Sequence, residues 1–69
     1  MTVVDADTIT DAQIRGLRES AKARHNTWLV GICNHALSTD PDPDVAAYRG
    51  ECRARCAEIL NRRNHQEIP

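Results

Sequence analysis

A chain of 69 residues has room for one domain and a small core, which is marginally stable at this size. The formal net charge of -1 argues against wholesale attraction to nucleic acid, which needs a clear basic excess. Phenylalanine is absent and large apolar side chains are few, so we expect self-association or a partner protein to complete the core.

The cysteine content and the lack of long apolar runs indicate the cellular location of the protein. Three cysteines are an odd number and too few for the disulfide framework of a small secreted domain. No basic-then-apolar signal segment opens the chain, and no apolar run approaches the roughly 20 residues that span a bilayer. We therefore expect a cytoplasmic protein.

The chain divides into an arm, one helical domain and a short tail. Residues 1–8 have no periodicity and are predicted to form a flexible N-terminal arm. Residues 9–64 form the domain, and the polar residues 65–69 are predicted to fray.

The first helix has a clear start signal. Thr10 and Gln13 have the spacing of a capping box, and Ile9 and Ile14 occupy the two positions of a hydrophobic staple. A narrow apolar stripe then follows, formed by Ile14, Leu17 and Ala21. The pattern predicts a helix over Asp11–Arg24 that must dock on other elements to be stable.

A break between residues 24 and 27 is expected next. His25 can lie near the last carbonyls of the first helix, Asn26 tolerates the left-handed conformation that ends helices, and Thr27 can cap the next helix. The alternative is one unbroken helix from Asp11 to Leu37. Because its apolar positions do not keep one face through the junction, we favour two helices.

The second helix is the element around which the others are organised. Thr27–Leu37 is apolar around more than half of a helical circumference and leaves only a strip of Gly31, Asn34 and His35. A helix this apolar must be covered on two sides. We expect the first and third helices to cover it.

The third helix follows a segment that cannot be helical. Ser38–Asp44 contains two Asp-Pro pairs, and Asp before Pro is a natural N-cap and first helical position, so the helix should start between Asp40 and Asp44. Its apolar stripe consists of Val45, Tyr48, Cys52, Cys56, Ile59 and Leu60. With a third helix over Asp44–Arg63, the predicted fold is all-α: a three-helix bundle made of a helical hairpin and a longer third helix.

Three short stretches resemble small helical proteins of phages and mobile elements. They are the run from Ile9 to Arg15 followed by Leu17-Arg18, Cys33 followed by Ala36-Leu37, and the run from Cys56 to Leu60. The resemblance implies a compact helical fold and a phage or mobile-element setting. It implies no activity and assigns no functional residue.

A metal site is one alternative function for the cysteines. Zinc requires four Cys or His ligands, and the candidates are Cys33, Cys52 and Cys56 with His25, His35 or His65. All three cysteines, however, fall on apolar stripes, where free cysteine behaves as a small buried hydrophobe. We therefore expect core cysteines and no cofactor, with a metal-stapled domain as the alternative.

Enzyme and nucleic-acid functions have weaker sequence support. No Ser or Cys has an evident oriented base, and the glycines are isolated, so we expect no enzyme. Thr27–Leu37 offers only Asn34 and His35 to read base edges, which argues against a recognition helix. The alternative nucleic-acid surface is the arginine flank of the third helix, formed by Arg49, Arg53, Arg62 and Arg63.

The remaining hypothesis is a non-enzymatic protein-interaction module. We expect a homodimer or a complex with a host or phage protein. The candidate contact residues are Trp28, Val30 and Tyr48, because aromatic residues are enriched at interfaces. Trp28 has an alternative role in which it closes the end of the bundle as a core residue.

Overall fold

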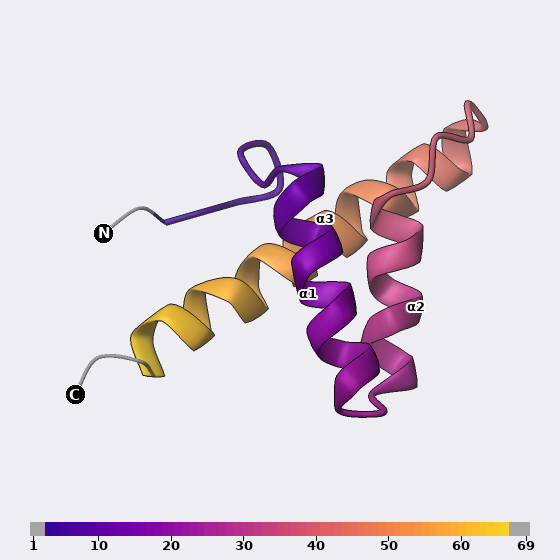
Figure 1. Ribbon diagram of the computed structural model, residues 1–69. Helices are drawn as coiled ribbons and strands as arrows, with labels where there is room; N and C mark the ends of the chain where they lie inside the picture. Colours follow the sequence, from indigo (N-terminus) through magenta and orange to yellow (C-terminus); the bar gives the residue numbers. More distant parts are fainter. Residues whose placement is uncertain (1–2, 67–69) are drawn as a thin grey trace.

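Three helices make up the computed structural model, which describes residues 3–66 (Figure 1). They are α1 (Asp11–Ala23), α2 (Thr27–Ala36) and α3 (Pro43–Gln66). The predicted all-α class with a hairpin and a longer third helix is therefore confirmed, and the unbroken helix over α1 and α2 is wrong. The predictions for residues 1–2 and 67–69 lie outside the described residues.

The helices form two layers rather than a parallel bundle. α1 and α2 lie side by side as a hairpin, and α3 crosses behind both of them (Figure 1). α2 packs against both α1 and α3, as its apolar circumference requires. The molecule measures 43 × 27 × 16 Å, so it is thin in one direction. Because α3 extends beyond the hairpin on both sides, α1 and α2 cover only part of its surface (Figure 1).

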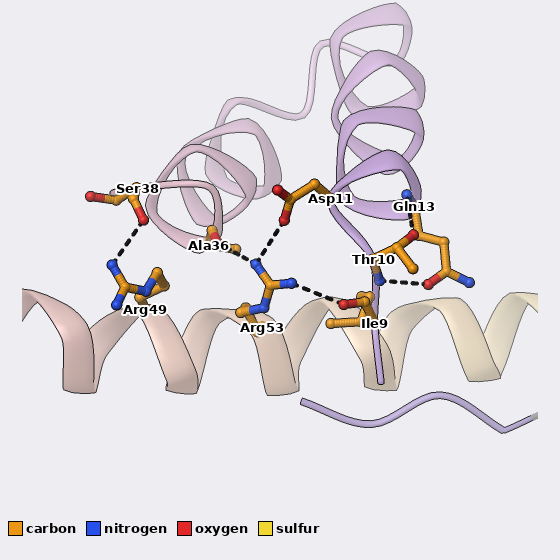
Figure 2. A network of polar contacts seen from close by, with 8 residues as sticks. All are labelled: Ile9, Thr10, Asp11, Gln13, Ala36, Ser38, Arg49 and Arg53. Atoms are coloured by element: carbon orange, nitrogen blue, oxygen red, sulfur yellow. Dashed lines mark hydrogen bonds and ion pairs between the residues drawn. The ribbon is translucent and has the colours of Figure 1, made fainter. Parts of the chain in front are cut away.

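The start of α1 confirms the capping box. The Gln13 backbone N–H donates to Thr10 Oγ1 at 3.1 Å, and the Thr10 N–H donates to Gln13 Oε1 at 2.8 Å (Figure 2). Ile9 and Ile14, the two staple residues, are both buried. The cap and the staple together fix the angle at which the chain enters the hairpin.

The turn between α1 and α2 lies one residue earlier than predicted. His25, not Asn26, has the left-handed conformation, with φ of 57°. The N–H groups of His25 and Asn26 donate to the carbonyls of Lys22 (3.1 Å) and Ala21 (2.9 Å), which is a Schellman motif. Asn26 is then free to cap α2, and its Oδ1 accepts from Leu29 N–H at 3.2 Å. An amide side chain is a stronger N-cap than the predicted Thr27.

The start of α3 follows its sequence signal and the end does not. Asp42 precedes Pro43, the first helical residue, and accepts the Asp44 N–H through Oδ1 at 2.8 Å. The helix continues to Gln66, past the predicted end at Arg63, and the predicted fraying of the last residues stays a prediction. Residues 64–66 include no Gly or Pro that would stop a helix, and the next such residue in the sequence is Pro69.

The core lies where the hairpin meets the middle of α3. The predicted stripe of α1 is buried, as are Cys52 and Cys56 of the α3 stripe. The buried residues are Val4, Ile9, Ile14, Leu17, Ala21, Leu29, Cys33, Ala36, Cys52, Cys56 and Ala57. Few of them are large, and Val30, Ile32, Leu37, Ile59 and Leu60 remain only partly buried around them.

The N-terminal segment is bound to α3. Val4 is buried, its N–H donates to Asn61 Oδ1 at 3.1 Å, and its carbonyl accepts from Asn61 Nδ2 at 2.8 Å. Asp5 then accepts the N–H groups of Asp7 and Thr8 through Oδ1 and forms a tight turn before α1. The flexibility predicted for residues 1–8 stays a prediction, and this docking counts against it for residues 4–8.

Arg53 joins all three helices. Its guanidinium donates to the carbonyls of Ile9 (2.9 Å) and Ala36 (3.0 Å) and to Asp11 Oδ1 (3.1 Å) (Figure 2). These acceptors lie just before α1, at the end of α2 and in the first turn of α1. A cation at the C-terminus of α2 also complements the helix dipole there. One side chain of α3 therefore fixes the position of both hairpin helices.

We predict that Arg53→Met lowers the free energy of unfolding by about 2 kcal/mol, because three charge-assisted hydrogen bonds are lost and two carbonyls lose their donor. Urea unfolding followed by far-UV circular dichroism measures the change. Arg15→Met, at an exposed position of α1, is the matched control and should change stability by less than about 0.5 kcal/mol. Equal losses in both variants would contradict the role assigned to Arg53.

We predict that His25→Gly raises the free energy of unfolding by about 1 kcal/mol, because glycine adopts the left-handed conformation without the steric cost of a side chain. The same urea titration measures it. His25→Ala also removes the imidazole but keeps a Cβ, so it should bring no gain. A similar gain in both variants would assign the effect to the imidazole rather than to the backbone.

Candidate functional site

Trp28 lies on the surface in the first turn of α2. Its side chain is 57% exposed, whereas the adjacent Leu29 is buried against the core. The cause is the thin, two-layer arrangement, since α1 and α3 cover only part of the apolar circumference of α2. Of the two roles considered for Trp28, its position is that of a surface residue.

A hollow of about 240 Å³ opens on one side of Trp28, between α2 and α3. It is lined by Trp28, Ile32, Tyr48, Glu51, Cys52 and Arg55. Ile32 follows Trp28 by four residues and therefore lies on the same side of α2. The hollow has an apolar wall on α2 and an aromatic and charged wall on α3.

A second hollow, of about 280 Å³, lies on the other side of Trp28. Its lining includes Leu17 and Leu29 from the hairpin and Ile59 and Arg63 from α3. Trp28 is the residue that both hollows share, so the two form one surface along the flank of α3. We call the residues Trp28, Ile32, Tyr48 and Ile59 the Trp28 surface.

Tyr48 is held in place from both layers while remaining 44% exposed. Its ring meets the His35 ring of α2 edge-on, with centroids 5.0 Å apart and an interplanar angle of 70°. The hydrogen bond with the neighbouring Cys52 thiol raises the pKa of the Tyr48 phenol. A positioned aromatic ring with a polar tip is suited to binding a protein.

The three predicted contact residues do not share one surface. Trp28 and Tyr48 line the same hollow, but Val30 lies in a separate hollow with Lys22 and His25. Val30 is two residues from Trp28 and therefore points to the opposite side of α2. Ile32 and Ile59 belong to the Trp28 surface and were not among the predicted contacts, although the four-residue spacing from Trp28 was a signal for Ile32.

Comparisons with known proteins add no assignment to this surface. Family models, curated proteins and solved structures gave no match to the chain. Among the described residues, no helix is long and apolar enough to cross a membrane.

The four candidate nucleic-acid arginines do not form one patch. Arg53 is engaged by the hairpin, and Arg49 donates to the carbonyls of Ser38 (2.9 Å) and Asp40 (3.3 Å). Arg62 lies on the exposed flank of α3 and pairs with Glu58, and Arg63 lines the second hollow. Backbone carbonyls accept hydrogen bonds from the guanidinium groups of Arg49 and Arg53, which favours structural roles for both.

The three cysteines lie in the core, and two of them are in contact. Cys33 Sγ and Cys56 Sγ are 3.9 Å apart, and all three thiols are free. No cluster of three potential Cys, His, Asp or Glu ligands was found in the part of the chain that the structure describes. The burial of the three side chains among apolar residues is what the core role requires.

Burial raises the pKa of all three thiols, and that of Cys56 rises from 9.0 to about 12. The unfolded chain therefore releases the Cys56 proton at a lower pH than the folded chain does. The contribution of Cys56 to the free energy of unfolding is therefore complete below pH 9 and is lost as the pH rises toward 12. A thiol held protonated in this way is also a poor nucleophile.

We predict that the free energy of unfolding falls by about 1 kcal/mol between pH 8 and pH 10 because of Cys56 alone. Urea midpoints across this range measure the slope. Cys56→Ala is less stable at every pH but has a shallower slope, because the titrating thiol is gone. Parallel slopes for the two chains would contradict the assignment of the pH dependence to Cys56.

Proposed function

We propose that this chain is a small non-enzymatic protein-interaction module that binds a protein through the Trp28 surface. The observation that supports the proposal most is the exposure of Trp28 (57%) and Tyr48 (44%) beside the same hollow. A chain with so few large apolar residues leaves both of its aromatic rings outside the core. Tryptophan and tyrosine are enriched among residues that carry binding energy, so a protein that covers these rings gains most from contact here.

The structure of the hollows supports a protein rather than a small molecule as the bound species. Small-molecule sites enclose most of a ligand within a volume of about 300–1,000 Å³. The two hollows at Trp28 have volumes of about 240 and 280 Å³ and lie on either side of an exposed ring. A surface with one projecting ring and a shallow hollow on each side of it can accept the side chains of a partner protein.

The biological setting is part of the proposal and rests on sequence alone. The resemblance to small phage and mobile-element proteins supports a phage or mobile-element origin and a host or phage protein as partner. The low number of cysteines supports a cytoplasmic location. Self-association into a homodimer is supported by the small core.

The proposal is tested by photo-crosslinking from the Trp28 surface. A photoreactive phenylalanine analogue replaces Tyr48 in the full chain, and the chain is irradiated both alone and in extract from its native cells. We expect a protein adduct, because the residue at position 48 lies within the bound interface. Combination with Trp28→Ala should abolish most of the adduct while the helical circular dichroism signal stays.

The matched control places the same analogue at Arg15, which is exposed on α1 and lines neither hollow at Trp28. That chain should give little adduct with any protein. If position 48 forms no adduct in either sample, or no more than position 15 does, the Trp28 surface does not bind a protein and the proposal fails.

A further inference from the structure

A stripe of charges with alternating sign borders the Trp28 surface along α3. Its members are Glu51, Arg55, Glu58 and Arg62, and all are exposed. Their spacings of four, three and four residues place them on one side of the helix. Glu51 and Arg55 also line the first hollow, so the stripe and the Trp28 surface are continuous.

The order of charges in this stripe is complementary to itself. Positions 55 and 58, and likewise positions 51 and 62, are symmetric about the midpoint between Cys56 and Ala57. When two copies of α3 lie antiparallel about a two-fold axis at this midpoint, each arginine faces a glutamate of the second copy. A parallel arrangement would instead place like charges opposite each other. An interface between identical copies needs this kind of self-complementarity.

Trp28 independently marks the same midpoint. The first hollow meets α3 at residues up to Arg55, and the second meets it at Ile59 and Arg63. Trp28 lines both hollows, so it lies beside the stretch between Arg55 and Ile59, which contains the midpoint of the stripe. A two-fold axis there brings the Trp28 rings of both copies close together, and each copy covers the most exposed aromatic ring of the other.

Within the described residues, two of the four charges form no ion pair. Glu51 and Arg55 make no ion pair with any other residue of the described range 3–63, whereas Arg62 Nη2 lies 2.7 Å from Glu58 Oε1. Isolated exposed ion pairs contribute little, but networks of several charges contribute more. The antiparallel arrangement joins both stripes into one network.

We propose that the occupant of the Trp28 surface is a second copy of this chain, bound with its α3 antiparallel so that Arg55 faces Glu58 and Glu51 faces Arg62 of the other copy. This inference rests on the proposed protein-binding function and names its partner. A standard interface covers about 800 Å² of each partner, roughly a sixth of the 4833 Å² surface of this chain. The flank of α3 with the adjoining side of α2 provides a continuous area for it.

The test exchanges charges across the proposed two-fold axis. Arg55→Glu places two pairs of glutamates face to face in a dimer, and Glu58→Arg places two pairs of arginines face to face. Each variant alone should raise the Kd of the dimer about tenfold or more. In an equimolar mixture of the two variants all four contacts are again between opposite charges, so a heterodimer should form with an affinity near that of the wild type. The double variant R55E/E58R should dimerise with itself for the same reason.

Sedimentation equilibrium of the purified full chain over a dilution series gives the Kd. Emission of Trp28, the only tryptophan, gives a second readout and should shift to the red as the wild-type dimer dissociates. Arg15→Glu makes the same change in net charge as Arg55→Glu on exposed α1 and should leave the Kd within about twofold. Circular dichroism confirms that each variant keeps its helices.

The outcomes separate this inference from the proposed function. Weak dimers of the single variants together with a strong mixed dimer support the antiparallel second copy. A wild-type chain that stays monomeric at all concentrations overturns it, and so does a wild-type dimer that none of the charge changes weakens. In the first case an adduct of position 48 with another protein would leave the proposed function standing. In the second case an adduct with another protein, or with a second copy in a different arrangement, would do the same. The absence of any such adduct would remove both.

Discussion

The arrangement of the three helices depends on the guanidinium of Arg53. Two backbone carbonyls and one carboxylate accept from it, and they belong to the entry of α1 and the end of α2. Neither hairpin helix fixes its own angle on α3 by burial alone, because the apolar stripe of α1 is narrow and the apolar surface of α2 is spread around its circumference instead of forming a single face. A directional, charge-assisted contact therefore determines a geometry that non-directional burial leaves open.

The same contact explains why part of the apolar surface remains outside. With the hairpin held across the middle of α3, Cys33, Cys52 and Cys56 are covered completely and the aromatic residues on the flank are not. Small buried thiols fill the space at the crossing, where a larger ring would not fit between closely packed helices. The rings lie instead beside the crossing, and this geometry generates the Trp28 surface.

Local signals in the sequence were sufficient to predict the helices but not the angle at which the hairpin crosses α3. The capping box at Thr10, the Asp42-Pro43 start and the stripe of Ile14, Leu17 and Ala21 depend on neighbours within one or two turns, so they could be predicted. The Arg53 contacts and the separation of Val30 from Trp28 depend on where a distant helix lies. Helical periodicity placed Tyr48 on the apolar stripe of α3, but only the crossing angle decides which part of that stripe is covered.

The pairing of Val4 with Asn61 affects how the chain folds. The two residues are 57 positions apart, and Arg53 binds a carbonyl 44 positions earlier. Helical proteins usually fold rapidly because most of their contacts are local, whereas distant contacts require closure of a long loop first. Here the hairpin can form early, but its angle on α3 and the docking of the N-terminal segment wait for the last third of the chain. The completed fold is thus a late, cooperative event that joins both ends of the sequence.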